Sequence, residues 1–387
     1  MKAISLNGRD GSGKSQQIRL LKWRNQNQLH ITKPLGSYST RWPKLTGYEA
    51  SQWWFEIVPV DELTDIIIES LNVRQEDCLS DRFSVYDRGT RMFKAVCAAT
   101  RMTRENVSLL AAIRITDRQF DGGLNHFTDE YEILFKIDPD YFSRVGKFVE
   151  VIRPREDIGF PDSARCRYRQ YQSNLAAAME VYFSQPVPFC IEVKESILSI
   201  QNRLREILNT ACQIKLPQIR ETPQLFVCLG GLSECGKSSF AEHLRINYQF
   251  CRLKLRYFIE IIEKRGDAVT PESICLELFD YLERHYFLAR ISIESLHDPF
   301  VPAILKLMLG EQVQIVYIEV DYSTRVRRAA KERNVGFEVA DMIVTEKDRI
   351  KRDRGAERVR NIADIIFDNS SNVLQLNLKT FADRLIS

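Results

Sequence analysis

The chain carries one local pattern twice: a short apolar run, a glycine-rich turn that ends in Gly-Lys-Ser, and a segment with helical periodicity. The first copy, ISLNGRDGSGKSQQIRLL, occupies residues 4–21, and the second, LFVCLGGLSECGKSSFAEHL, occupies residues 225–244. A domain typically holds about 100 to 200 residues, so in a chain of 387 residues the copies open separate domains. The pattern therefore predicts two domains built on the same local unit.

Each half continues with strand-like apolar runs that alternate with helix-like segments. This alternation is typical of a parallel sheet covered by helices. In the first half we expect strands at residues 3–6, 29–32, 83–86, 132–137 and 188–193. In the second half we expect them at 225–229, 287–293, 314–320 and 365–367, with 373–376 as a further candidate. The sequence thus predicts an α/β fold with two tandem parallel sheets, each flanked by helices.

Helical periodicity is clearest at residues 61–71, 173–183, 196–208 and 271–282. Between the two halves, the segment TACQIKLPQIRETPQ contains Pro217 and Pro223 and has no helical apolar stripe, so we interpret it as a linker. We place the first domain at residues 1–215, the linker at 216–224 and the second domain at 225–387.

The overall composition limits the classes of function. Hydrophobic residues make up 44% of the chain and charged residues 28%, and the formal net charge is +3, so nucleic acid is not indicated as a partner, although it is not excluded as an acceptor. The nine cysteines form no C-x-x-C pair, which favours reduced thiols over a zinc site. The first apolar run is too short for a signal peptide, and no run reaches the roughly 18 apolar residues that span a membrane. We expect a cytoplasmic protein with no membrane partner.

The first glycine-rich turn, residues 8–15, fits the phosphate-binding pattern G-x-x-x-x-G-K-[ST]. Glycines let the backbone wrap closely around phosphates, and the exposed amides and the following helix N-terminus attract the anion. Lys14 is expected to bridge the terminal phosphates, and the Ser15 hydroxyl to hold Mg²⁺, which prefers oxygen ligands. The nucleotide-binding candidates of this first phosphate loop are Gly8, Asp10, Gly11, Ser12, Gly13, Lys14 and Ser15.

The second turn, residues 231–238, repeats the pattern. Lys237 is expected to contact the terminal phosphates and Ser238 to hold Mg²⁺, as Lys14 and Ser15 do in the first loop. Glu234 adds a negative charge to an anion-binding loop, so we expect its side chain to point away from the phosphates. The nucleotide-binding candidates of this second phosphate loop are Gly231, Ser233, Gly236, Lys237 and Ser238.

The first half resembles thymidylate kinase and its nucleoside-monophosphate-kinase relatives. The resemblance rests on LNGRDGSGKSQQ, VYDRG, ILFKIDPD and RCRYRQYQSNLA. It implies transfer of a phosphoryl group from ATP, with Mg²⁺, to a thymidylate-like monophosphate, with Asp87 and Arg88 near the acceptor and the metal-bound phosphates. It also places Arg153 and Arg155, in VIRPREDIGF, in a lid over the transferring group, although ordinary solvated arginines remain an alternative.

Two departures from that family put base selection in doubt. Thymidylate kinases usually carry an aromatic residue after Asp-Arg, where this chain has Gly89, and an Arg-Glu-Pro-Gly element where it has the segment 33–36, KPLG. Lys33 could still meet an acceptor phosphate. The aromatic residues of segment 53–55, WWF, could stack on a flat acceptor, but core packing is the commoner fate of such side chains.

The second half resembles the compact kinases around dephospho-coenzyme A kinase and deoxynucleoside-monophosphate kinase. The resemblance rests on LGGLSECGKSSFAEHL, VYIEVDYSTRVRRAAKERN and IADIIFDNSS. It implies an acidic residue near metal and acceptor, for which Glu294 is the candidate, an acidic strand end at Glu319 or Asp321, and a nucleotide contact at Asn369. Basic residues that either form a lid around phosphates or lie on a solvated helix face are Arg325, Arg327, Arg328, Arg333, Lys347, Arg349, Lys351, Arg352 and Arg354.

The leading hypothesis is an ATP- and Mg²⁺-dependent phosphotransferase with two tandem P-loop kinase-like domains. The proposed catalytic set is Lys14, Asp87, Arg88, Arg153, Arg155, Lys237 and Glu294. Its partners would be a nucleotide and a small phosphorylated acceptor, and a homodimer is open because thymidylate kinases often dimerise. Two alternatives remain: a kinase of a modified nucleotide, a nucleic-acid base or a biosynthetic metabolite, and a non-catalytic nucleotide sensor.

Overall fold

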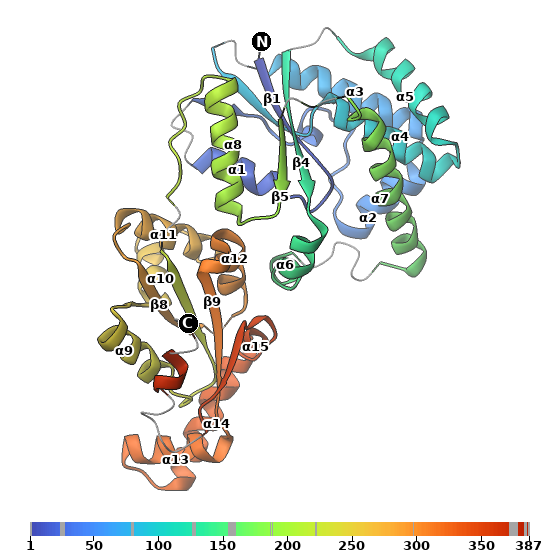
Figure 1. Ribbon diagram of the computed structural model, residues 1–387. Helices are drawn as coiled ribbons and strands as arrows, with labels where there is room; N and C mark the ends of the chain where they lie inside the picture. Colours follow the sequence, from blue (N-terminus) through green and yellow to red (C-terminus); the bar gives the residue numbers. More distant parts are fainter. Residues whose placement is uncertain are drawn as a thin grey trace. The chain divides into compact units, whose positions relative to one another are not determined.

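The computed structural model describes residues 2–23, 28–78, 81–125, 129–153, 160–185, 187, 189–220, 223–296, 298–370, 378–382 and 385. The chain divides into two compact units, Met1–Ser143 with Arg155–Gln218, and Arg144–Pro154 with Ile219–Ser387. Each unit contains one parallel sheet with helices around it (Figure 1). None of the helices in the described ranges combines the length and the hydrophobicity that a membrane span requires.

The first sheet has five strands in the order β2-β3-β1-β4-β5, all parallel. Their bounds are β1 (Lys2–Asn7), β2 (Leu29–Ile31), β3 (Phe83–Asp87), β4 (Asp129–Ile137) and β5 (Phe189–Val193). Alternating apolar residues such as Ile4 and Leu6 are fully buried, as expected for strands covered on both faces. All five expected strands of the first half are confirmed, with small shifts at their ends.

Helices cover both faces of this sheet (Figure 1). On one face, α1 (Lys14–Trp23) and α8 (Ile197–Ala211) pack on the strands, and Leu21, Leu204 and Leu208 belong to the same buried cluster as Ile4 and Leu6. Ile214 and Leu216 are also buried in this cluster, so the packing of the first unit continues past residue 215, where we expected the first domain to end.

The other helices of the first half pack largely on one another. They are α3 (Val60–Glu76), α4 (Thr90–Glu105), α5 (Leu109–Gly123) and α7 (Asp162–Tyr182). Helix α6 (Pro139–Ile152) follows β4, and the division between the two units falls within it, after Ser143. Between β2 and α3 the chain forms three short elements, η1 (Leu35–Ser37), α2 (Gly47–Gln52) and the π-helix η2 (Trp53–Ile57). The expected helices at 61–71, 173–183 and 196–208 lie within α3, α7 and α8, apart from the flanking residues Phe183 and Ser196.

The second sheet repeats the topology of the first, with the order β10-β9-β6-β8-β7 and parallel pairing throughout. Its strands are β6 (Leu225–Gly230), β7 (Cys251–Lys254), β8 (Arg290–Leu296), β9 (Val313–Glu319) and β10 (Ile365–Asp368). In both sheets the strand before the phosphate loop is central, between the third and fourth strands of its half.

The strands expected at 225–229, 314–320 and 365–367 are confirmed as β6, β9 and β10, and the strand expected at 287–293 is β8 with a shifted start. The strand expected at 287–293 begins at Arg290, because Tyr286 and Phe287 belong to the turn after the preceding helix and are exposed. The fifth strand is β7, which we did not predict. The candidate strand at 373–376 lies outside the described residues.

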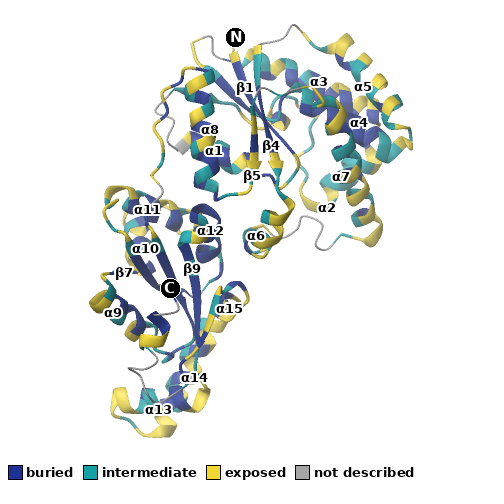
Figure 2. Cartoon of the chain, in the orientation of Figure 1, coloured by how far each residue is buried: buried dark blue, intermediate teal, exposed yellow. Residues whose placement is uncertain are grey.

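Helices also flank the second sheet, and its strands are the buried centre of the unit (Figure 2). Helix α9 (Lys237–Tyr248) packs on one face, where Phe240 joins Phe367 and Phe381 in a buried cluster. The remaining helices are α10 (Leu255–Lys264), α11 (Pro271–Arg284), α12 (Phe300–Leu309) and α15 (Arg358–Ile362), with the short η3 (Gly310–Gln312) before β9. Between β9 and α15, α13 (Tyr322–Arg333) and α14 (Phe337–Asp353) pack on each other through a small apolar cluster.

Candidate phosphate-binding sites

The first phosphate loop joins β1 to α1 and curves around the side chain of Lys14. Gly8, Gly11 and Gly13 adopt positive φ, a region that residues with a Cβ rarely enter. The Lys14 ammonium donates to the carbonyls of Gly8 and Arg9, both at 2.8 Å, and to Ser12 Oγ at 3.1 Å. Lys14 is 5% exposed. The loop therefore holds a buried cation within its own curve, where a polyphosphate would need one.

Ser15 and Asp87 meet at the carboxyl edge of the first sheet. The parallel register sets Asp87 of β3 opposite Leu6 of β1, so the end of β3 lies beside the phosphate loop. The Ser15 hydroxyl donates to Asp87 Oδ2 at 2.8 Å. A hydroxyl and a carboxylate side by side are the oxygen ligands that Mg²⁺ prefers, so the residues present fit this ion.

Arg88 ties the end of β3 to the phosphate loop. It has a φ of +70°, and its guanidinium forms an ion pair with Asp10 of the loop. Asp10 also accepts a hydrogen bond from Gln172 Nε2 of α7 at 2.9 Å. Burial alone would raise the pKa of Asp10, but Arg88, Gln172 and Lys14 hold it below its ordinary value. Asp10 is thus an anion that fixes the loop from one side.

Gly89 lies in a closely packed turn after β3. A Cβ at this position would lie 1.6 Å from Glu130 Oε1 and 2.6 Å from Ser5 Oγ. The aromatic residue that thymidylate kinases usually carry here would fit only if the side chains of Glu130 and Ser5 moved. The Gly89 amide donates to Asn7 Oδ1 at 2.8 Å, which holds this turn against β1.

For the aromatic residues 53–55, the sequence left open either stacking on a flat acceptor or packing in the core. Trp53 and Trp54 pack with Trp42 against the buried cluster of α3, and the Trp54 indole donates to Thr100 Oγ1 at 3.1 Å. Phe55 packs on the ring of Tyr171. These contacts favour core packing over a stacking surface for a ligand.

The predicted lid arginines of the first half are only partly described. Arg153 directly follows α6, and its amide donates to Val149 O at 2.8 Å. Arg155 lies outside the described residues. A lid role for either side chain therefore stays a prediction.

The second phosphate loop joins β6 to α9 and repeats the first contact pattern. The Lys237 ammonium donates to the carbonyls of Gly231 at 2.8 Å and Leu232 at 2.6 Å, and contacts Cys235 Sγ at 3.3 Å. Gly231 and Gly236 adopt positive φ. Cys235 takes the place that Ser12 has in the first loop, so both loops hold their lysine in the same way.

Ser238 and Glu294 repeat the pair of hydroxyl and carboxylate found in the first unit. Ser238 Oγ donates to Glu294 Oε2 at 2.8 Å, and Glu294 is 2% exposed on β8. The two sites differ in the partner of the carboxylate, because Arg252 Nε of β7 donates to Glu294 Oε1 at 2.9 Å. Arg252 also contacts Glu242 at 3.1 Å. Arg252 could not be singled out from the sequence because the strand that carries it, β7, was not predicted.

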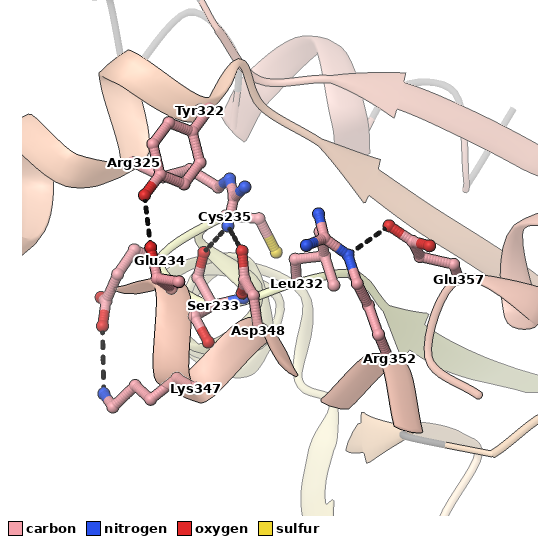
Figure 3. Close-up of polar contacts among 12 residues, drawn as sticks. Leu232, Ser233, Glu234, Cys235, Tyr322, Arg325, Lys347, Asp348, Arg352 and Glu357 are labelled. Atoms are coloured by element: carbon pink, nitrogen blue, oxygen red, sulfur yellow. Dashed lines mark hydrogen bonds and ion pairs between the residues drawn. The ribbon is translucent and has the colours of Figure 1, made fainter. Parts of the chain in front are cut away.

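A buried ion pair braces the second loop through the backbone of Ser233 (Figure 3). The Ser233 amide donates to Asp348 Oδ1 at 3.0 Å, and Arg325 Nη1 donates to Ser233 O at 3.2 Å. Arg325 and Asp348 pair with each other, and they are 3% and 1% exposed. Arg325, which the sequence placed among candidate lid residues, is therefore buried in the brace of the loop.

Asn369 supports the second loop from the end of β10. Its side chain is fully buried and donates to Cys235 O at 3.0 Å, while Arg328 Nη2 donates to Asn369 O at 2.7 Å. Of the two acidic candidates near β9, Glu319 pairs with Arg360 and Asp321 caps α13 by accepting from the Thr324 amide at 2.8 Å. A direct nucleotide contact by Asn369 stays a prediction.

A cavity of about 690 Å³ lies beside the second phosphate loop. Its lining includes Leu232 and Cys235 of the loop, the strand ends at Glu319 and Asp368, and Arg358 of α15. Small-molecule sites typically have volumes of about 300 to 1,000 Å³, so the cavity is large enough for a nucleotide portion.

Comparisons with known proteins give similarity of fold at low sequence identity. No protein-family model matches the chain, and no curated protein matches it. An uncharacterized protein from Eubacterium ventriosum ATCC 27560 is 13% identical, with a TM-score of 0.32, over 42% of this chain and 99% of that chain. TT1252 from Thermus thermophilus is 15% identical, with a TM-score of 0.27, over 43% of this chain and 97% of its own. Thymidylate kinase from Candida albicans is 17% identical, with a TM-score of 0.37, over 56% of this chain and 94% of its own. Because the identities are below 25% and the TM-scores below 0.5, these likenesses support no conclusion about function.

Proposed function

We propose that the first unit transfers the terminal phosphoryl group of ATP to a nucleoside monophosphate or a related small phosphorylated acceptor. The observation that carries the proposal is the pair Ser15 and Asp87, 2.8 Å apart beside a phosphate loop that already encloses Lys14. Phosphoryl transfer needs a cation on the terminal phosphates, a metal-binding hydroxyl and a carboxylate near the acceptor, within one small site. The first loop and the end of β3 supply these three groups.

The roles of the side chains follow from their chemistry. Lys14 would contact the terminal phosphates, and Ser15 and Asp87 would hold Mg²⁺, which neutralises charge on the phosphates when bound. Arg88 would meet a phosphate or stay on Asp10, and the role of Arg153 and Arg155 as lid residues stays the one that the resemblance implies. Transfer is direct and in line, with no covalent enzyme intermediate.

For the second unit we propose nucleotide binding at the loop around Lys237, Ser238 and Glu294. A regulatory role, without transfer, is favoured by one specific contact. Glu294 is buried and paired with Arg252, whereas no ion pair to Asp87 is found among the described residues. A carboxylate whose charge is already matched attracts a metal or an acceptor proton less strongly. The second unit is thus the better candidate for a nucleotide sensor.

The acceptor of the first unit is tested by measuring ATP consumption against a panel of nucleoside monophosphates and dephospho-coenzyme A, with each product identified by mass spectrometry. Formation of a nucleoside diphosphate that stops in Lys14→Ala would support the proposal. ATP binding without any phosphorylated product would overturn it, and a modified nucleotide, a nucleic-acid base or a sensor role would then move ahead.

A further inference from the structure

The structure sorts the basic residues of α13 and α14, which the sequence could only treat as one run. Arg325 is buried in the brace of the loop. Arg349 pairs with Glu346 at 2.7 Å, and Arg352 with Glu357 at 2.8 Å, both on the surface. These three side chains are therefore already paired with carboxylates of the protein.

Arg333 and Lys347 instead face the tip of the second phosphate loop. Lys347 Nζ lies 3.2 Å from Glu234 Oε1, and Arg333 Nη2 lies 3.7 Å from the same oxygen (Figure 3 shows the contact with Lys347). The Glu234 side chain is 14% exposed, but the Lys347 and Arg333 side chains are 42% and 36% exposed. The carboxylate is covered, while its two cations are still open to a ligand from solution.

Glu234 is an unusual residue for this position. It has a φ of +57°, where a side chain is strained, and Gly11 has the same place in the first loop with a φ of +82°. Burial would raise the pKa of Glu234, but Lys347, a hydrogen bond with Glu332 and the charge of Arg333 hold it below its ordinary value, so the group is an anion at neutral pH. A strained anion within an anion-binding loop disfavours phosphate binding unless it can be displaced.

We propose that Arg333 and Lys347 form an anion subsite of the second phosphate loop, and that Glu234 occupies this subsite until the terminal phosphate of a nucleotide displaces it. A phosphate carries more charge and more acceptor oxygens than a carboxylate, so the two cations prefer it once it is held by the loop. The inference rests on the proposed nucleotide binding by the second unit. It goes further by naming the residues that receive the terminal phosphate and the group that competes with it.

The competition predicts opposite effects for the two sides of the ion pair. Removing the carboxylate charge in Glu234→Gln frees the subsite, and ATP should bind about three- to tenfold more tightly, because the competent state is then fully populated. Removing the cation in Lys347→Gln should weaken ATP binding by about the same factor. If the ion pair only stabilised the surface, Glu234→Gln and Lys347→Gln would not change the ATP affinity in opposite directions.

Two further variants, Glu234→Gly and Glu346→Gln, test whether backbone strain or net charge explains the effect of Glu234→Gln. Glu234→Gly removes both the charge and the positive-φ strain, whereas Glu234→Gln removes the charge alone. Glu346→Gln removes one negative charge from an exposed ion pair on α14 and serves as the control for net charge. We expect tighter binding in both Glu234 variants and wild-type affinity in Glu346→Gln.

The test measures binding of Mg-ATP, Mg-ADP and inorganic tripolyphosphate by titration calorimetry. All proteins are full chains that also carry Lys14→Ala, which prevents the first phosphate loop from binding the nucleotide. The inference predicts larger changes for ATP and tripolyphosphate than for ADP. It is overturned if Glu234→Gln and Glu234→Gly leave ATP affinity unchanged or weaken it, or if only Glu234→Gly tightens it, which would assign the effect to strain.

The same titration separates failure of this inference from failure of the proposed function. The second loop could bind no nucleotide in the Lys14→Ala chain but bind it once Glu234 is also substituted. Nucleotide binding by the wild-type second loop would then be overturned, while competition between Glu234 and the phosphate would be supported. If neither binds, both are overturned.

Discussion

Arg325 and Asp348 form a buried ion pair that holds the second phosphate loop by the amide and the carbonyl of Ser233. The first loop is braced at the same position, Asp10, but through its side chain and by Arg88 from the end of β3. Each loop is thus held in place by an arginine from a different element. Preorganised loops of this kind bind anions without first ordering their amides.

Breaking this brace should destabilise the second unit. Asp348→Asn leaves Arg325 buried without its counter-ion, and loss of one partner of a buried ion pair typically lowers the free energy of unfolding by about 3 to 5 kcal/mol. All four tryptophans lie in the first half of the chain, so tryptophan fluorescence reports on the first unit and far-UV circular dichroism on both. We expect the urea midpoint to fall by circular dichroism but not by fluorescence.

The matched control is Asp353→Asn, because the Asp353 side chain is 65% exposed and pairs with Arg349 on the surface. It should unfold like the wild type. Equal midpoints for Asp348→Asn and the wild type by both probes would show that the pair does not stabilise the loop.

The pair Ser15 and Asp87 should matter for transfer more than for folding. Asp87→Asn keeps the shape but removes the charge, and we expect the rate of phosphoryl transfer to fall by about 100-fold or more. Ser15→Ala should lower the affinity for Mg²⁺ by about 10- to 100-fold. Both effects are measured as transfer rates against Mg²⁺ concentration, with Asp81→Asn, an exposed change before β3, as the control. Full activity of Asp87→Asn at all Mg²⁺ concentrations would remove Asp87 from the site.

Glu132 should make the stability of the first unit depend on pH. Burial, with repulsion from Glu130, raises the pKa of Glu132 from 4.5 to about 7, although Arg91 opposes the shift. The folded state then holds a proton that the unfolded chain releases, so stability is fully present below about pH 4.5 and is lost as pH rises toward 7. The loss amounts to about 3 kcal/mol.

Urea unfolding followed by tryptophan fluorescence checks this prediction across that pH range. Glu132→Gln removes the titrating group, so its stability relative to the wild type should grow as pH rises. A constant difference between the two proteins would contradict the raised pKa.

Lys351 of α14 should give nucleotide binding by the second loop its own pH dependence. Burial and the neighbouring charge of Lys237 lower the pKa of Lys351 to about 8. A bound phosphate favours the charged ammonium, so binding takes up a proton, and ATP affinity should fall as pH rises above about 8. Titrations in the Lys14→Ala chain measure this effect, and Lys351→Met should lose it. The same pH profile in both proteins would assign the dependence to another group.

Much of the fold could be predicted from local patterns. The strands of the first half and the two phosphate loops are marked by apolar runs next to glycines, and the structure has them at those places. Strand β7 was missed because it has only four residues, Cys251–Lys254, although its alternation of apolar and basic residues is a weak strand signal. The shared strand order of the two sheets could not be predicted, since pairing depends on contacts far apart in sequence.

The candidate sites were predictable only where a motif carries the chemistry. Lys14 and Lys237 follow from spacing, but the pairing of Glu294 with Arg252 joins residues on two strands, one of them not predicted. Sequence also could not separate Arg325, which is buried, from Arg349, which is on the surface, because both occur in basic helices. Burial and partner choice decide the roles of such residues.

The most direct test of the account follows the γ-phosphate of labelled ATP in single turnovers with the wild type, Lys14→Ala and Lys237→Ala, using an acceptor found in the panel of monophosphates. We predict that the label reaches the acceptor in the wild type and in Lys237→Ala, and that Lys14→Ala abolishes the transfer. Transfer that survives in Lys14→Ala and is lost in Lys237→Ala would contradict the account by assigning the chemistry to the second loop.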